Sequence, residues 1–273
     1  TAIAVGGPGA VFWMWIIALL GSASAFVEST LAQLYKRKGK DSFIGGPAYY
    51  MRYGLGLNWM GALFAILISV TFGFAFNSVQ SNTICEAMQG SFGFDPKIVG
   101  AILTVLTLVI IFGGIQRIAK VSSVLVPMMA LGYVALALGI VLFNITELPT
   151  VIKLIVSSAF GWEQAVGGTV GAALMQGIKR GLFSNEAGMG STPHAHARAT
   201  AENPHKQGLC AMISVFIDTF VILNLTVFSV LTTGALESGK NGTALTQAAF
   251  MRGFGTFGIV FVAVCLLFFA FST

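Results

Sequence analysis

The sequence has 273 residues, of which 15 are Lys or Arg and 10 are Asp or Glu, for a formal net charge of +5. Charged residues make up 9% of the chain and hydrophobic residues 56%, whereas roughly a quarter of an ordinary soluble domain is charged. So little polar surface cannot cover the core of a soluble protein of this length, which excludes the soluble, disordered and fibrous classes. The composition predicts an all-α integral membrane protein.

The positive net charge does not predict a nucleic-acid partner, because no basic run interleaved with aromatic residues is present. The three cysteines, Cys85, Cys210 and Cys265, are far apart in or beside apolar segments. Their spacing indicates neither a metal site nor a disulfide framework.

A membrane-spanning helix needs about 20 mostly apolar residues. Seven segments meet this condition, at about 8–36, 58–86, 97–115, 119–143, 164–199, 208–234 and 254–273. The apolar stretch 151–156 is too short to span, and an interfacial helix is expected there. The chain begins without methionine and stops inside an apolar run, so we expect it to be the middle of a longer protein, with residues 1–273 forming part of a single transmembrane transport domain.

Basic residues alternate between the predicted loops. Nine of the 15 lie in the connections after the first, third and fifth spans: Lys36, Arg37, Lys38, Lys40, Arg52, Arg117, Lys120, Arg198 and Lys206. Because cytoplasmic loops carry an excess of Lys and Arg, these connections are assigned to the cytoplasm. The pattern predicts a multi-pass protein of the cell membrane.

The fifth apolar segment is interrupted. Residues 179–193 hold two adjacent cations, several glycines and a proline, which a lipid-facing helix cannot accommodate. Irregular backbone at membrane depth is tolerated only where protein or a water-filled cavity satisfies it. A Gly/Pro-interrupted span is the best pointer from sequence to a transporter binding site.

The interrupted segment reads Arg-Gly-Leu-Phe-Ser-Asn-Glu-Ala-Gly-Met-Gly-Ser at 180–191. It resembles the signature of the alanine or glycine:cation symporter family, the sodium:alanine symporters. Three further stretches agree with that family: Gly-Gly-Pro-Gly-Ala-Val-Phe-Trp-Met-Trp at 6–15, Asn-Ser-Val-Gln-Ser-Asn at 77–82, and Phe-Ala-Phe-Ser-Thr at 269–273.

The resemblance implies a LeuT-type fold, an inverted-repeat bundle with discontinuous helices, of which this chain would hold the end of helix 1 through helix 8. It also implies sodium-coupled symport of a small neutral amino acid, alanine or glycine, by alternating access in the lipid bilayer. Such a protein is not an enzyme, uses Na⁺ as a co-transported ion without an organic cofactor, and is expected to work as a monomer.

Substrate contacts are expected at the interruption. Ser184 and Asn185 offer polar groups, Phe183 and Met189 would close a pocket over a small side chain, and Gly188 and Gly190 allow close backbone approach. The alternative is a simple kink packed by neighbouring helices.

Asn77 and Gln80 are three residues apart, so they share a helix face. Amides in such positions line a cavity or hydrogen-bond across helices. The resemblance places this motif beside the substrate, so Gln80 and Asn77 are predicted substrate contacts, with interhelical contact as the alternative.

Sodium is a hard cation that prefers oxygen ligands. The resemblance implies that Ser272 and Thr273 bind one sodium ion, although their hydroxyls would otherwise hydrogen-bond to their own helix. Ser184, Asp218 and Thr219 are further candidates, with an ion pair from Asp218 to Lys179 or Arg180 as the alternative. Glu186 is expected to accept exposed N–H groups at the interruption, and a structural or snorkelling role is expected for Glu28.

Two other functions remain open from the residues. A membrane-embedded metallohydrolase would use His194, His196 and His205, although no His-Glu-x-x-His pattern is present. An ion channel is the other alternative, although no repeated selectivity loop is evident.

Overall fold

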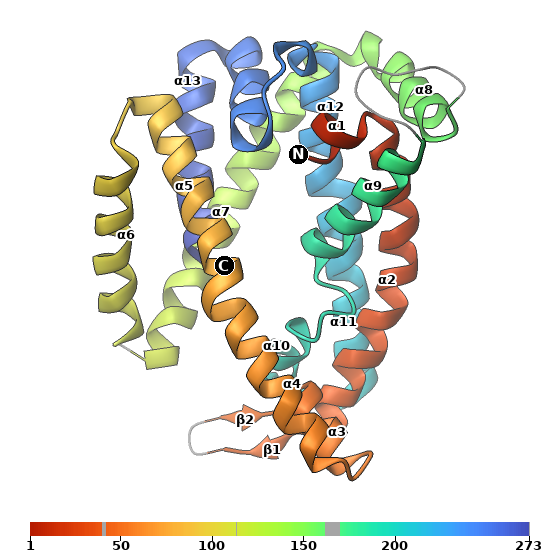
Figure 1. Cartoon of the computed structure of the whole chain (residues 1–273), viewed down its shortest axis with the longest axis vertical. Coiled ribbons are helices and arrows are strands. Elements are labelled where there is room, and N and C mark those ends of the chain that lie inside the picture. The colour runs from red at the N-terminus through yellow and green to blue at the C-terminus, as the bar shows by residue number, and fades with distance from the viewer. Residues whose placement is uncertain (40–41, 113, 162–169, 273) are drawn as a thin grey trace. The chain divides into compact units, whose positions relative to one another are not determined.

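A computed structural model describes residues 1–39, 42–112, 114–161 and 170–272 and is helical nearly throughout (Figure 1). The α-helices are α1 (Ala2–Gly6), α2 (Gly9–Leu34), α3 (Pro47–Tyr53), α4 (Asn58–Val70), α5 (Asn77–Phe92), α6 (Pro96–Ile111), α7 (Gly114–Phe143), α8 (Leu148–Ala159), α9 (Val170–Asn185), α10 (Thr192–Arg198), α11 (Pro204–Phe216), α12 (Asn224–Thr232) and α13 (Gly242–Ser272). Short 3₁₀ turns are η2 (Ile145–Glu147) and η4 (Ala235–Ser238), and two π-helical segments are η1 (Thr71–Phe76) and η3 (Ile217–Leu223). The strands β1 (Arg37–Lys38) and β2 (Phe43–Ile44) form an antiparallel pair in which Arg37 lies opposite Ile44.

Five helices in the described ranges are long and apolar enough to cross a membrane: Gly9–Leu34, Asn58–Phe92, Val126–Phe143, Pro204–Thr232 and Gly242–Ala270. They confirm that the chain has the helices of a multi-pass membrane protein. Helix α8 has 12 residues and covers the stretch 151–156, for which the sequence predicts a short helix. An interfacial position for α8 stays a prediction.

Two of the seven predicted spans do not stand among these five. The segment predicted at 97–115 folds as α6. Its stretch Pro96–Val109 is apolar but shorter than the five helices above. The segment predicted at 164–199 is divided into α9 and α10, and its first residues, 164–169, lie outside the described residues. The polar and glycine-rich composition of 179–193 prevents one continuous helix there.

The last predicted span, 254–273, is part of a longer helix that begins at Gly242. Gly255 has φ 62° and ψ −146°, so α13 is kinked at this residue. A positive φ of this kind favours glycine. The part of α13 that follows the kink corresponds to the predicted span.

The described chain divides into two compact units. Unit 1 comprises Thr1, Phe74–Ile152 and Leu225–Thr273, and unit 2 comprises Ala2–Gly73 and Lys153–Asn224. Our expectation of one transport domain over 1–273 stays a prediction.

Small residues form the core of unit 2. Ala18 and Ala25 of α2, Ala187 after α9, and Ala211 and Val215 of α11 are buried together. Close packing also needs the glycines of α9, because a Cβ at Gly177 would lie 2.7 Å from the carbonyl oxygen of Ala10. Small residues allow helix backbones to approach closely in membranes, so α9 and α11 both pack tightly on α2.

Larger side chains form a core in unit 1, where Ile84 and Met88 of α5 pack with Val99 and Leu103 of α6 and Ala270 of α13. Helices α5 and α13 are also joined by Gln247, which is buried and donates to the Ala87 carbonyl at 3.0 Å and the Ser91 hydroxyl at 2.9 Å. These contacts hold α5, the helix that begins with Asn77, against α6 and α13.

Candidate functional site

The predicted interruption of the fifth segment is confirmed. Helix α9 ends at Asn185 and α10 begins at Thr192, with coil between them (Figure 1). Three residues of this break have positive φ: Glu186 at 51°, Gly188 at 82° and Gly190 at 81°. Only glycine adopts this region at little cost, which explains the Gly-x-Gly spacing, and Glu186 is the only non-glycine residue with positive φ in the described chain.

Side chains hold the break in place. The Gly188 N–H donates to the carboxylate of Glu28 in α2 at 3.2 Å. The Ala187 N–H donates to the Asn185 side-chain oxygen at 3.1 Å, and the Ser191 hydroxyl donates to the Glu186 carboxylate. We expected Glu186 to accept exposed N–H groups, and this assignment was wrong, because Glu186 accepts the Ser191 hydroxyl. The N–H of Gly188 is accepted by Glu28 instead, which is a structural role, one of the two expected for Glu28.

Two of the predicted cation ligands lie in contact. The Ser184 hydroxyl, in the last turn of α9, donates to the Asp218 carboxylate in η3 at 2.7 Å. Asp218 forms no ion pair with Lys179 or Arg180, because the single ion pair of the described residues joins Lys206 and Glu202. A carboxylate and a hydroxyl at a helix end therefore come together from two elements.

The residues that follow Ser184 and Asp218 along the chain each have a buried polar atom without a hydrogen-bond partner in the described structure: the Asn185 side-chain nitrogen and the Thr219 hydroxyl. Thr219 follows Asp218 in η3 and is completely buried. Buried polar groups are nearly always paired, so unpaired ones at a break in a helix indicate a place for a ligand or water. π-helical turns such as η3 are frequent at functional sites.

The other end of α10 is fixed by α2. Gln33 donates to the carbonyl oxygens of His196 and, at 2.9 Å, Ala199, while Lys36 donates to Ala199 at 2.9 Å. These contacts satisfy carbonyls that a helix end leaves free, and the Lys36 charge suits the negative end of the helix dipole. Helix α2 therefore holds both the break and the segment that follows it.

Tyr50 of α3 lies close to the same region of α2. Burial is the main cause that raises the pKa of the Tyr50 phenol above its ordinary value, and the negative charge of Glu28 adds to it. The charge effect indicates that the Tyr50 phenol and the carboxylate that holds the break are close enough to interact electrostatically.

Asn77 and Gln80 lie in unit 1, where both line a cavity of about 280 Å³. Further polar groups, Ser81, Thr104 and Thr107, line the same cavity. The two amides thus share one face of α5, as predicted, directly after the π-helical turn η1.

The structure says less about four other residues predicted to bind substrate or sodium: Phe183, Met189, Ser272 and Thr273. Phe183 is half-buried in the last turn of α9, and Met189 is half-buried within the break. Ser272 is the last residue of α13, with its side chain outside what the structure describes, and Thr273 lies outside the described residues. Sodium binding at Ser272 and Thr273 stays a prediction.

The three histidines are not gathered at a metal site. No group of three or more His, Cys, Asp or Glu side chains within the described ranges is placed to hold a metal ion. His196 Nδ1 is 2.8 Å from the Gln207 side-chain oxygen, and His194 Nδ1 is 3.2 Å from the Ser191 carbonyl.

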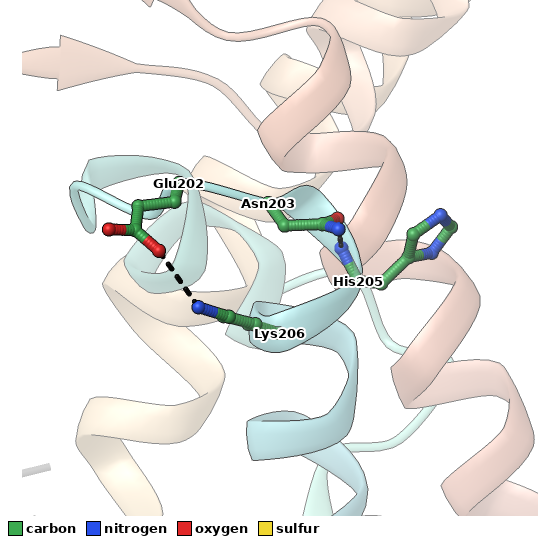
Figure 2. A network of polar contacts seen from close by, with 4 residues as sticks. All are labelled: Glu202, Asn203, His205 and Lys206. Carbon is green, nitrogen blue, oxygen red and sulfur yellow. Dashed lines mark hydrogen bonds and ion pairs between the residues drawn. The ribbon is translucent and has the colours of Figure 1, made fainter.

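The third histidine belongs to the start of α11. Asn203 caps this helix by accepting from the His205 N–H at 3.0 Å, and Lys206 pairs with Glu202 at 2.9 Å (Figure 2). Figure 2 shows the His205 ring pointing away from that ion pair, and the ring stacks against Phe26 at 6.2 Å between centroids. Each histidine therefore has a separate structural partner, and the geometry does not support the metallohydrolase alternative.

Sequence comparisons agree with the signature motifs. The chain is 53% identical over 271 residues to the probable sodium/glutamine symporter GlnT of Bacillus subtilis, covering 99% of this chain and 57% of that protein. It is 51% identical over 272 residues to the amino-acid carrier protein AlsT of the same organism, covering 100% of this chain and 58% of AlsT. It is 39% identical over 289 residues to the sodium/proton-dependent alanine carrier protein of Bacillus sp. PS3, covering 100% of this chain and 64% of that protein.

The chain thus spans 57 to 64% of the length of these relatives. The profile of the sodium:alanine symporter family matches residues 1–273. The chain belongs to the sodium:alanine symporter family.

Proposed function

We propose that this chain is part of a transporter that couples the inward movement of Na⁺ to that of a small neutral amino acid, alanine or glycine, by alternating access. The observation that carries the proposal is the break between α9 and α10, where Ser184 meets Asp218 and the next residue after each, Asn185 and Thr219, has a buried polar atom without a partner. Transporter sites of this kind use broken helices at membrane depth, because the interruption frees N–H and carbonyl groups for ligands.

Sodium is assigned to the Ser184–Asp218 pair. A carboxylate and a hydroxyl are oxygen ligands suited to a hard cation, and an ionised Asp218 inside a membrane-spanning helix is costly unless a cation compensates it. The unpartnered Thr219 hydroxyl and the carbonyls at the end of α9 are further oxygen donors of the same region. A second sodium ion is proposed at Ser272 and Thr273, on the resemblance alone.

The amino acid is assigned to the N–H groups of the break, which suit its carboxylate. Gly188 and Gly190 let the substrate approach the backbone, Asn185 offers an amide, and Phe183 with Met189 limits the size of the side chain. In unit 1, Gln80 and Asn77 are proposed as polar contacts of the substrate. The fold proposed for the whole protein is the LeuT-type bundle of inverted repeats, acting as a monomer in the cell membrane.

Relatives carry both alanine and glutamine in their names, so the size of the side chain is the point to test. The full-length transporter is reconstituted in liposomes, and uptake of labelled alanine, glycine and glutamine is measured in sodium and in choline buffer. We expect sodium-dependent uptake of alanine or glycine with weaker competition by glutamine. Uptake that is equal in choline would overturn sodium coupling, and preference for glutamine would overturn the small-substrate assignment.

The variant Asp218→Asn separates the ion from the substrate in the same assay. If Asp218 binds sodium, the variant requires more sodium for half-maximal uptake while saturating sodium restores the alanine KM. A variant whose sodium dependence is unchanged excludes Asp218 as a ligand.

A further inference from the structure

Two guanidinium groups lie on one aromatic ring near the start of α4. The Arg37 Cζ is 4.4 Å from the centroid of the Tyr53 ring, and the Arg52 Cζ is 5.3 Å from it. A second ring, that of Tyr49, lies 6.1 Å from Tyr53 between centroids. Strand β1 and helix α3 thus bring two positive charges to one place.

No carboxylate balances these charges in the part of the chain that the structure describes, where the one ion pair is Lys206–Glu202. Cation–π contacts hold the guanidinium groups but leave their net charge in place. The two positive charges near this ring therefore attract an anion.

A cavity of about 560 Å³ opens beside Arg52, Tyr49 and Tyr53, between α3 and the first turns of α4. Arg37 does not line it but contacts Tyr53, which does. One end is polar, with Arg52, Tyr49, Tyr53 and Asn58, and the other is apolar, with Ala48, Gly61, Ala62 and Ala65. Gly61 lets α3 and α4 approach closely at this point, since a Cβ there would lie 2.7 Å from the carbonyl oxygen of Ala48.

The apolar end continues along a helix that is itself long and apolar enough to cross the membrane, Asn58–Phe92. Ala62 and Ala65 are exposed on α4, and large apolar residues beside them are also exposed, Trp59 by 64% and Ile66 by 62%. Exposed apolar surface at the start of a membrane-spanning helix is surface for lipid chains, and aromatic residues gather at headgroup level.

We propose that this cavity binds an anionic phospholipid. The phosphate lies at Arg52 with Tyr49, Tyr53 and Asn58 around the headgroup, Arg37 adds its positive charge from the Tyr53 ring, and one acyl chain follows Ala62 and Ala65 along α4. The loop carrying Arg37 and Arg52 is assigned to the cytoplasm by its charge, the face where anionic lipids attract basic segments. A soluble anion fits the polar end alone, whereas a phospholipid accounts for both ends of the cavity.

The test uses the full-length transporter purified in a neutral detergent. Its thermal midpoint is measured while dioleoylphosphatidylglycerol or dioleoylphosphatidylcholine is added, because these lipids share acyl chains and differ in net charge. Soluble glycerol phosphate is added in a third arm. We expect phosphatidylglycerol to raise the midpoint well below the concentration at which phosphatidylcholine does, and glycerol phosphate to have no such effect.

The variant Arg37→Gln with Arg52→Gln should require roughly 30-fold more phosphatidylglycerol for the same shift, since each basic residue near an anionic lipid surface contributes about a factor of five. A charge-matched control, Lys97→Gln with Lys153→Gln, removes two exposed cations elsewhere and should respond like the wild type. Ala62→Phe fills the apolar end without changing charge, so it should weaken the response even if the double Arg variant does not fold.

Three results would overturn the proposal. Phosphatidylcholine could act at the same concentration as phosphatidylglycerol, which would leave no role for the two arginines. Glycerol phosphate could give the full shift, which would make the site one for soluble anions. An unchanged response in Ala62→Phe would remove the acyl chain from the cavity.

Discussion

The Ser184 hydroxyl donates a 2.7 Å hydrogen bond to the Asp218 carboxylate, which joins the last turn of α9 to the π-helical segment η3. The two residues are 34 positions apart in the sequence. The residues next to Asp218, at the end of α11 and in η3, are mostly apolar. A carboxylate in such a helix is a functional candidate by default, and its contact with the helix break gives that candidate a specific role.

Replacing Asp218 with Asn keeps an acceptor for Ser184 but removes the negative charge. We expect the sodium concentration for half-maximal uptake to rise by about tenfold or more, because a unit charge in contact with a cation contributes several kcal/mol at a partly buried site. Uptake by the reconstituted full-length protein, measured over a range of sodium concentrations, tests this. Glu202→Gln is the control, since this exposed carboxylate pairs only with Lys206 on the surface.

Glu28 is predicted to act through the backbone of the break. Glu28→Leu removes the acceptor of the Gly188 N–H, and the loss should destabilise the protein by about 1 kcal/mol while uptake falls more strongly. Glu28→Gln keeps an acceptor oxygen and should retain most of both. Thermal midpoint and uptake are measured together, with the exposed Glu147→Gln as control. Equal behaviour of Glu28→Leu and Glu28→Gln would show that the hydrogen bond has no part in transport.

Gln80 is the predicted substrate contact that lines the cavity of α5 and α6. Gln80→Leu keeps much of the volume and removes the amide, so the KM for alanine should rise by about tenfold, the worth of one or two hydrogen bonds. Ser78→Ala on the same helix is the control, because the Ser78 hydroxyl donates at 2.7 Å to the Phe74 carbonyl in the preceding turn, η1. A KM that moves equally in both variants would assign Gln80 a structural role.

The interruption could be predicted from sequence because its causes are local. Glycines, a proline and charges within fifteen residues are incompatible with a lipid-facing helix, whatever surrounds them. The kink at Gly255 has the same local origin, and the span predicted from residue 254 begins beside it.

The partner of the break could not be predicted in this way. Glu28 and Gly188 are 160 positions apart, and their contact depends on how closely α9 packs on α2, which the small residues at Gly177 and Ala10 permit. The π-helical turns were missed as well, because one extra residue in a helical turn changes no apolar pattern visible in the sequence. A carboxylate inside an apolar helix, as at Glu28 and Asp218, is a signal visible in the sequence, but it names no partner, and neither the Gly188 nor the Ser184 contact was predicted from the sequence.

The two glycines of the break form a matched pair for the last prediction. Both have positive φ, 82° at Gly188 and 81° at Gly190, so alanine at either position carries a backbone cost of about 1–2 kcal/mol. The room for an added methyl group differs between the two positions. A Cβ at Gly188 would lie 3.8 Å from the nearest contact, Ser24 Cβ, whereas a Cβ at Gly190 would lie 2.6 Å from Phe64 Cζ and 2.9 Å from Pro47 Cγ.

Gly190→Ala should therefore lower the thermal midpoint and uptake more than Gly188→Ala does. Phe64→Leu makes room beside Gly190 and should recover part of the loss in Gly190→Ala, while it should add independently to Gly188→Ala. A double-mutant cycle of thermal midpoints measures this, because residues in contact couple and separated residues add. The absence of coupling between Gly190 and Phe64 would mean that the break does not pack against α4 at this point, and then the positive φ and the contact with Pro47 would have to explain why glycine stands at 190.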